Sequence, residues 1–155
     1  MMQIIIPMSG YGERFKKAGY QIPKPLIIVD KKPIIEHVIN MFPGEKNIIF
    51  ICNKDHLENK KYNMKNILQK IAPKSKIVSI SPHKLGPVYA ILKAKKFINL
   101  KLPTIVNYCD FTCYWDYKKF KKYVLNKEFN IDGVIPCYKD FLPHTLWSNY
   151  YAYVK

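Results

Sequence analysis

Apolar residues along the chain gather in short continuous runs that alternate with segments in which apolar positions recur at helical spacing. The runs occupy residues 4–6, 47–52, 76–80, 104–108 and 133–137, and one more begins at 150–154. Strands that are apolar on both faces and separated by helices are typical of a parallel sheet covered on both sides. We therefore predict an α/β fold with three layers, in which a mostly parallel sheet has helices on both faces.

The segments with helical spacing predict four helices, at residues 33–42, 55–71, 86–100 and 114–125. In the third helix we expect Val88, Ile91, Leu92 and Ile98 to face the sheet. Residues 26–29 are predicted to form a short edge strand that ends in a turn at 30–33. A chain of 155 residues has the size of one domain, so we assign residues 1–155 to a single domain.

The first 26 residues contain the strongest functional signal. The apolar run at residues 4–6 breaks at Pro7 into a loop that carries Gly10 and Gly12, and a basic amphipathic segment follows at 13–17. Glycine has no side chain to keep a ligand away, so backbone N–H groups in such a loop can converge on an anion. The predicted ligand is a phosphate group.

This glycine loop differs from the two commonest phosphate loops. A dinucleotide fingerprint needs a third glycine where this chain has Phe15, and a P-loop ends in Gly-Lys-Ser/Thr. The chain has instead Gly-x-Gly-x-Arg, and ten residues after Arg14 it has Lys24 in Pro-Lys-Pro-Leu. This combination resembles the signature of the nucleotidyltransferases that activate sugar phosphates, the family with the Rossmann-like nucleotide-diphospho-sugar transferase fold.

The resemblance implies a role for each matching residue. Arg14 would hold the leaving phosphates, Lys24 would place a compact charge on the phosphate that is attacked, and Asp110 would bind Mg²⁺. The nucleotide-binding residues implied are Ser9, Gly10, Tyr11, Gly12 and Gly86. Gly86 belongs to the turn Leu85-Gly86-Pro87, which resembles the family's base-contacting loop, although Pro87 and Tyr89 depart from that pattern.

Composition supports the role of Arg14. The chain has 26 Lys plus Arg, yet Arg14 is its sole arginine. Its planar guanidinium can grip a phosphate with two hydrogen bonds, which a lysine cannot do. The alternative is a solvated arginine on a helix surface.

Asp110 follows the apolar run at 104–108, where an ionised carboxylate needs a cation or hydrogen-bond donors. The carboxyl ends of parallel strands meet at one edge of the sheet, so the glycine loop, the 85–87 turn and residues 107–110 should converge on one cleft. The alternative for Asp110 is a cap of the next turn. The resemblance implies that the family's second metal-binding carboxylate lies well beyond the fourth strand, in a part that this sequence does not contain. If the domain is instead complete, Asp116, Asp132 and Asp140 are the candidates.

Other residue types point to less specific roles. Cys52, Cys109, Cys113 and Cys137 have no metal spacing, and we expect buried, reduced thiols. His37, His56, His83 and His144 also lack metal spacing, so we expect them to be structural or exposed. No run approaches the roughly 20 apolar residues of a membrane span, and the N-terminus does not resemble a signal peptide, which predicts a cytoplasmic protein without a membrane partner.

The net charge of +15 raises nucleic-acid binding as a rival function. The lysines are spread in small groups, so most of this charge is interpreted as solvated surface and nucleic acid is not the expected partner. The predicted function is Mg²⁺-dependent transfer of a nucleoside monophosphate from a nucleoside triphosphate to a phosphorylated acceptor such as a sugar phosphate. Pyrophosphate is released, and the product would serve surface polysaccharide (capsule or lipopolysaccharide) synthesis.

Two alternatives to this function are a non-catalytic nucleotide-binding remnant of the same family and a basic nucleic-acid-binding module. The sequence stops in a strand-like run at 150–154, which predicts a domain that is incomplete at its C-terminal end. An uncovered sheet edge would then favour homo-oligomers.

Overall fold

The computed structural model describes residues 1–129 and 131–137 of the chain. Its central sheet has four parallel strands in the order β5-β4-β1-β6. The strands are β1 (Gln3–Met8), β4 (Asn47–Asn53), β5 (Lys76–Ile80) and β6 (Thr104–Val106). A small hairpin of β2 (Ile28–Val29) and β3 (Lys32–Pro33) follows the 3₁₀ turn η1 (Lys24–Leu26). The predicted parallel sheet is confirmed.

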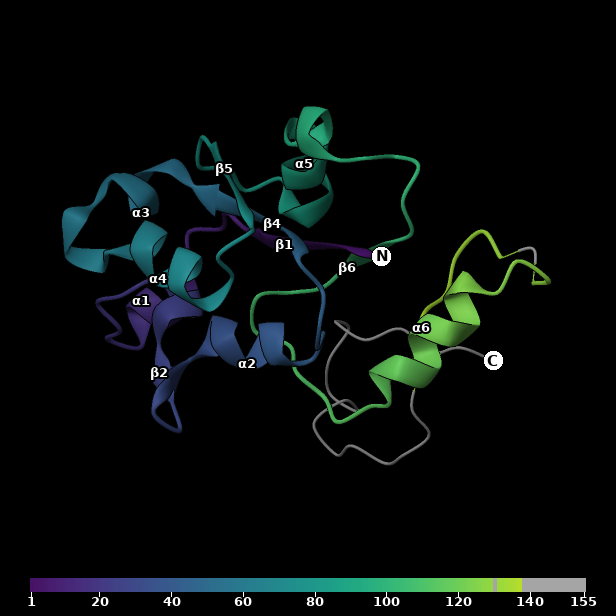
Figure 1. Ribbon diagram of the computed structural model, residues 1–155. Coiled ribbons are helices and arrows are strands. Elements are labelled where there is room, and N and C mark those ends of the chain that lie inside the picture. The colour runs from purple at the N-terminus through teal and green to yellow at the C-terminus, as the bar shows by residue number, and fades with distance from the viewer. Residues whose placement is uncertain (130, 138–155) are drawn as a thin grey trace, which may run out of the picture.

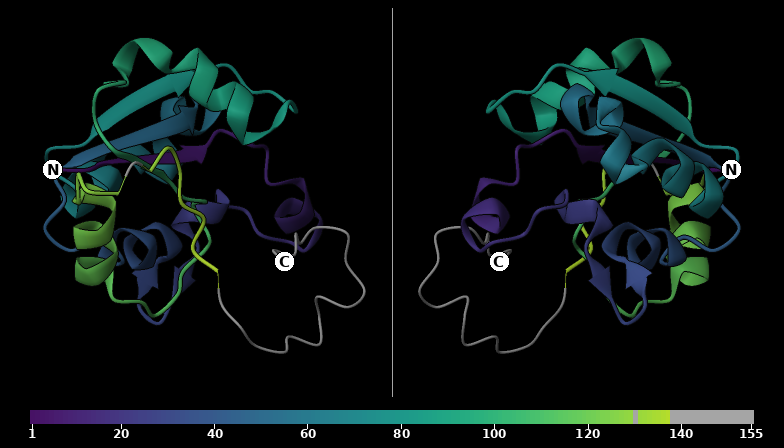
Figure 2. Two further views of the ribbon diagram at one scale, coloured as in Figure 1. Left: turned by 90° about the vertical axis from the view of Figure 1, so that its right-hand side faces the viewer. Right: turned by 90° about the vertical axis from the view of Figure 1, so that its left-hand side faces the viewer.

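Helices cover both faces of the sheet (Figure 1). They are α1 (Glu13–Lys17), α2 (Ile34–Asn40), α3 (Lys54–Glu58), α4 (Met64–Ile71), α5 (Gly86–Lys93) and α6 (Tyr117–Leu125), with 3₁₀ turns η2 (Lys60–Tyr62) and η3 (Lys95–Phe97). Figure 2 shows α5 on one face and α2 and α6 on the other. No helix in the described part of the chain is long and apolar enough to cross a membrane.

Alternation along β1 divides the core into two layers. Ile4 and Ile6 point to the face covered by α2 and α4, where Phe50, Val38 and Leu68 are also fully buried. Ile5 points to the opposite face, where it meets α5. Because both faces are buried, the strand can be apolar at every position.

The order of the strands creates a switch point. The chain moves outward from β1 to β4 and β5, and then crosses back to place β6 on the other side of β1. Ligands of open α/β sheets bind at the carboxyl ends of the strands at such a point. Here the switch point lies between β1 and β6.

Several predicted boundaries are wrong. The helix expected at 55–71 is broken into α3, η2 and α4, because Asn59 accepts a hydrogen bond from the Lys61 N–H and Asn63 adopts a left-handed conformation. Residues 133–137 do not form the expected strand: Pro136 has no N–H to donate, and Gly133, Val134 and Pro136 line a cavity of about 370 Å³ beside β6. The strand expected at 150–154 lies outside the described residues.

The inward face of α5 also differs from the prediction. Ala90 and Ala94 are fully buried against the sheet and Ile91 packs beside them, whereas Val88 and Leu92 are exposed. Val88 and Leu92 lie two positions from Ala90, on the opposite side of a helix with 3.6 residues per turn. The small alanines form the packing face, although the larger apolar residues dominate the sequence pattern of this helix.

Candidate active site

The glycine loop connects β1 to α1 and projects beyond the carboxyl end of β1 (Figure 2). Gly12 has φ +66° and accepts hydrogen bonds from the N–H groups of Phe15 and Lys16, both at 3.0 Å. This left-handed conformation favours glycine. Nothing in the described part of the chain lies within 4 Å of the position that a Cβ would take on Gly10 or Gly12. The loop backbone is therefore open to a ligand, and Arg14 follows directly on α1.

Lys24 is held on a rigid turn. It begins η1 between Pro23 and Pro25, which are buried, and its carbonyl accepts a hydrogen bond from the Ile27 N–H at 3.2 Å. The prolines fix the backbone on both sides, so the position of the lysine stem is well defined. Its ammonium lies over the ring of Phe15, 4.7 Å from the centroid, which connects this turn to α1.

Asp110 lies on the loop that follows β6. The Asn107 N–H continues the ladder by donating to the Ile5 carbonyl at 3.1 Å. The Asn107 side-chain amide then donates to the carbonyls of Tyr108 at 2.8 Å and Phe111 at 3.1 Å. These bonds close a tight loop that presents Asp110 at the switch point. A capping role, the alternative considered for Asp110, belongs instead to Asp116, which accepts from the Lys119 N–H at the start of α6.

The structure brings Lys24 and Asp110 together. The Lys24 Nζ and the Asp110 Oδ2 form an ion pair, and about a third of each side chain is exposed. Two residues that are 86 positions apart in the sequence thus meet beside the glycine loop. The predicted convergence of the segments after β1 and β6 is an observed geometry, while the catalytic roles of these side chains stay predictions.

The turn before α5 is joined to the glycine loop and to the first residue of α1 by one contact each. The Ser9 Oγ lies 2.9 Å from the His83 Nε2, and the Lys84 Nζ lies 2.9 Å from a Glu13 carboxylate oxygen. Gly86 follows with φ +79°, a conformation that again favours glycine. The contact with Lys84 lowers the pKa of Glu13. All three predicted segments of the site therefore lie around one loop.

Asp110 offers a single carboxylate to a metal ion. Among the described residues, no cluster of three or more His, Cys, Asp and Glu side chains could hold a metal ion. Mg²⁺ is often bound through one or two carboxylates together with substrate phosphates. A single carboxylate beside an open phosphate loop suits a cation that arrives with a triphosphate, and does not suit a permanent metal site. Of the other candidate carboxylates, Asp140 lies outside the described residues.

The cysteine beside the site, Cys109, is partly buried. Burial raises the pKa of the Cys109 thiol to about 12, and the negative charge of Asp110 adds to this effect. The thiol therefore stays protonated at neutral pH. Cys52 is buried as predicted, whereas Cys113 and Cys137 are exposed, and all four are free thiols.

Two contacts around the candidate site, those of His83 with Ser9 and of Phe15 with Lys24, were not predicted from the sequence. His83 was expected to be structural or exposed, and Phe15 was considered only as the residue that replaces a glycine. The position of His83 after the apolar run at 76–80 was a usable signal, because it places the ring at the same sheet edge as Ser9. The contact between Phe15 and Lys24 depends on how η1 folds back, which the sequence pattern does not reveal.

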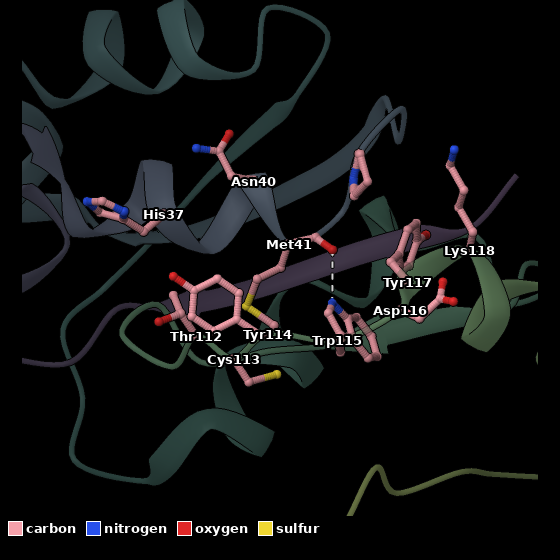
Figure 3. A pocket seen from close by; sticks show the side chains of 11 residues that line it. His37, Asn40, Met41, Thr112, Cys113, Tyr114, Trp115, Asp116, Tyr117 and Lys118 are labelled. Atoms are coloured by element: carbon pink, nitrogen blue, oxygen red, sulfur yellow. Dashed lines mark hydrogen bonds between the residues drawn. The ribbon is translucent and has the colours of Figure 1, made fainter.

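A separate cavity of about 550 Å³ lies between the end of α2 and residues 112–118 (Figure 3). Its wall is held by the Trp115 indole N–H, which donates to the Met41 carbonyl at 3.1 Å. Tyr114 also lines this cavity, and its side chain is fully exposed. None of the residues proposed to contact the triphosphate is in its wall.

The parallel sheet and the loops at its switch point define a Rossmann-like α/β protein. The model of the nucleotidyl transferase family matches residues 3–144, so the chain belongs to that family. Over 62 residues the chain is 36% identical to the UTP–glucose-1-phosphate uridylyltransferase of Haemophilus ducreyi. That match covers 37% of this chain and 21% of the Haemophilus protein.

Solved structures agree with this assignment. HddC from Yersinia pseudotuberculosis, complexed with GMP-PN, is 28% identical with a TM-score of 0.56, and the match covers 81% of this chain and 55% of HddC. The nucleoside-diphosphate-sugar pyrophosphorylase from Vibrio cholerae has the same fold, with 20% identity and a TM-score of 0.54 over 76% of this chain and 53% of that one. The chain thus spans about half the length of these structures.

Proposed function

We propose that the chain transfers a nucleoside monophosphate from a nucleoside triphosphate to a phosphorylated small acceptor, such as a sugar 1-phosphate. The observation that carries this proposal is the contact between Lys24 and Asp110 beside an open glycine loop, at the switch point of the sheet. Relatives named for UTP and glucose 1-phosphate, and one complexed with GMP-PN, support this substrate class.

The proposed reaction is a single displacement. A phosphate oxygen of the acceptor attacks the α-phosphorus of the nucleoside triphosphate and forms a new P–O bond. The bond from the α-phosphorus to the oxygen that bridges it to the β-phosphate breaks, and pyrophosphate leaves with that electron pair. No covalent intermediate with the protein is needed, so the side chains act by positioning and by compensating charge.

Each residue has a defined task in this proposal. The amides of the glycine loop and the Arg14 guanidinium hold the β- and γ-phosphates, and Lys24 holds the α-phosphate, where negative charge increases in the transition state. Mg²⁺ held by Asp110 would neutralise part of the triphosphate charge. Lys24 leaves Asp110 when the nucleotide binds, because its ammonium cannot serve both partners fully.

The proposed product would be an activated sugar for surface polysaccharide synthesis. To test the chemistry, the chain is incubated with CTP, UTP, GTP, ATP or dTTP, Mg²⁺ and a panel of sugar 1-phosphates, and pyrophosphate release is followed. We expect one nucleotide to be preferred and Asp110→Asn to abolish turnover. Calorimetry on the same nucleotides distinguishes the alternatives: binding without pyrophosphate release would indicate a non-catalytic nucleotide-binding remnant, and no binding would overturn the proposal.

A further inference from the structure

His83 lies between the two parts of the site that must hold one nucleotide. On one side its Nε2 lies 2.9 Å from the Ser9 Oγ at the start of the glycine loop. On the other side its Nδ1 accepts a hydrogen bond from the Leu85 N–H at 3.2 Å, immediately before Gly86. Its ring also packs against Tyr89 on α5, with centroids 4.7 Å apart. One imidazole thus contacts the glycine loop, the turn and the helix that follows.

These contacts determine the tautomer of His83. Because Nδ1 accepts from the Leu85 N–H, a neutral ring carries its hydrogen on Nε2. The Nε2–H then donates to the Ser9 hydroxyl oxygen, and the hydroxyl hydrogen is directed to another acceptor. A hydrogen bond from the Asn53 side-chain amide to the Ser9 carbonyl, at 3.2 Å, holds the Ser9 backbone in place. Ser9 is thereby oriented as a donor at the start of the phosphate loop.

Two neighbouring contacts connect the loop region to the turn, and they differ in how strongly they can hold the two together. The ion pair of Lys84 with Glu13 lies on the surface, where more than half of each side chain is exposed, so solvent and salt screen it and it contributes little to holding the loop. Ser9 is only 3% exposed, and its hydrogen bond with His83 is partly buried. An unsatisfied hydroxyl at such a position costs more than a surface contact. His83 is therefore the stronger connection between the loop and the turn.

We propose that His83 is a positioning residue that fixes the glycine loop against the turn at Leu85 and Gly86, so that the phosphate-binding and base-binding parts of the site keep a constant separation. This inference rests on the proposed function, which assigns the triphosphate to the loop, and on the expectation from the sequence that the turn contacts the base. Such preorganisation increases affinity for a ligand that spans both parts, without a direct contact from His83.

The proposal predicts a specific pattern of binding, measured by calorimetry with the preferred nucleoside triphosphate and with inorganic tripolyphosphate. In His83→Ala, nucleotide affinity should fall roughly 3- to 10-fold, as expected for loss of one hydrogen bond. Affinity for tripolyphosphate, which spans only the loop, should change less. His83→Gln should restore nucleotide affinity, because a glutamine amide can both donate to Ser9 and accept from Leu85. An equal loss for both ligands would contradict the positioning role.

Two further sets of variants test whether His83 acts through Ser9 and the glycine loop. His37→Ala removes a histidine that contacts the Val29 carbonyl at 2.8 Å, away from the loop, and should leave nucleotide affinity unchanged. Ser9→Ala should weaken nucleotide binding, and the double variant with His83→Ala should lose little more, because the two side chains act as one unit. Additive losses would show that His83 acts independently of Ser9.

A spectroscopic measurement tests the contacts of His83 without any nucleotide. Imidazole ¹⁵N spectra at about pH 8, where an ordinary histidine is neutral, should show His83 with its hydrogen on Nε2. Amide hydrogen exchange at residues 10–12 should be faster in His83→Ala than in the wild type. If these results hold but no nucleotide binds, the proposed function fails and the positioning role of His83 stands. The opposite tautomer together with unchanged exchange would overturn the proposal even if nucleotide binds.

Discussion

Arg14 and the lysines that surround it differ in geometry more than in charge. Arg14 lies at the exposed start of α1, next to the open backbone of the glycine loop. A guanidinium can donate two parallel hydrogen bonds to a phosphate, whereas an ammonium acts as a point charge. The identity of the cation at this position should therefore affect nucleotide binding even when the charge is kept.

We predict that Arg14→Lys weakens binding of the preferred nucleoside triphosphate by about 1 to 3 kcal/mol, because the two-pronged contact is lost. Isothermal titration calorimetry measures the change directly. Lys17→Arg is the matched control: it makes the reverse exchange at the other end of α1, so its affinity should equal that of the wild type. Equal affinities for Arg14→Lys and the wild type would remove Arg14 from the site.

Substitutions of Lys24 and of Asp110 are expected to change metal binding in opposite directions. Their ion pair places an ammonium against the only carboxylate that we assign to the cation. In Lys24→Met, the weak binding of Mn²⁺ to Asp110 in the nucleotide-free chain should become tighter, because the competing charge is removed, while nucleotide binding becomes weaker. Asp110→Asn should lose the metal dependence of nucleotide binding. Electron paramagnetic resonance of Mn²⁺ and calorimetry measure the two effects.

The exposed variant Glu58→Gln is the control for both changes, since it also removes a carboxylate that is paired with a lysine. Metal binding in this variant should match the wild type. Mn²⁺ affinity that is identical in Lys24→Met and the wild type would show that the ammonium does not compete with the cation. Because Lys24 and Asp110 are each about one-third exposed, their pair contributes only about 0–1 kcal/mol to stability. Loss of binding should therefore not reflect unfolding.

At the level of elements, Glu45 connects Met2, the residue that precedes β1, to the last described helix, α6. Its buried carboxylate accepts from the Met2 N–H at 3.2 Å and from the Tyr117 hydroxyl at 2.7 Å, and it forms an ion pair with Lys121. Burial alone would raise the pKa of Glu45, but the hydrogen bonds from Lys121, Tyr117 and Met2 outweigh it and hold the pKa below its usual range. The ionised carboxylate therefore stabilises the folded chain.

We predict that Glu45→Gln lowers the free energy of unfolding at pH 7 by about 2–3 kcal/mol, because the buried partners lose a charged acceptor. The folded-state pKa lies below the unfolded value of about 4.5, so this contribution is complete above that value and is lost as the pH falls through the lower folded pKa. Urea unfolding of both proteins from neutral to acidic pH measures it. The difference between them should shrink below about pH 4.5; a constant difference would contradict the role of ionisation.

The packing of α5 gives a second prediction for a single element. Ala90 is fully buried against the sheet, so Ala90→Leu should overpack this layer and cost about 1–3 kcal/mol. Leu92 lies on the exposed side of the same helix, and Leu92→Gln should change the free energy of unfolding by less than about 0.5 kcal/mol. Urea unfolding of the two variants compares the faces directly. A larger loss of stability in Leu92→Gln than in Ala90→Leu would contradict the packing of the Ala90 face against the sheet.

The elements differ in how far the sequence predicts them. β5 was predicted with its observed bounds, and β1, β4 and β6 within about two residues, because strands buried on both faces leave a continuous apolar pattern. The apolar spacing over residues 55–71 predicts one helix. The structure has separate helices there, because capping by Asn59 and the left-handed backbone at Asn63 interrupt the helix. The inward face of α5 was partly wrong, because its tightest contacts are made by alanines.

For the whole molecule, topology explains why much of the candidate site could be predicted. Loops after parallel strands share one edge, so the segments with Gly12, Gly86 and Asp110 were expected to converge before their distances were known. The side-chain contacts within that edge were not predictable. The Ser9–His83 hydrogen bond and the Lys24–Asp110 ion pair depend on how loops bend between the strands, and no periodic pattern records this.

The net charge of +15 allows a direct comparison of the two rival functions. A basic module that contacts 6–10 phosphates of a nucleic acid should lose roughly 10³- to 10⁵-fold in affinity between about 50 and 200 mM salt. A site built from Arg14, Lys24 and backbone amides should bind its nucleoside triphosphate with a much smaller loss, because much of the binding comes from directed hydrogen bonds. Fluorescence anisotropy with a labelled single-stranded oligonucleotide and with a labelled nucleotide measures both dependences under the same conditions.

We predict that Arg14→Lys weakens nucleotide binding at every salt concentration and leaves oligonucleotide binding unchanged, because the oligonucleotide contacts scattered lysines whose number is not altered. Lys24→Met should likewise affect the nucleotide more strongly. If the oligonucleotide instead binds more tightly than every nucleoside triphosphate, with a loss of 10³-fold or more over the salt range of about 50 to 200 mM and no dependence on Arg14, the basic surface and not the switch-point site would be the functional part of the molecule.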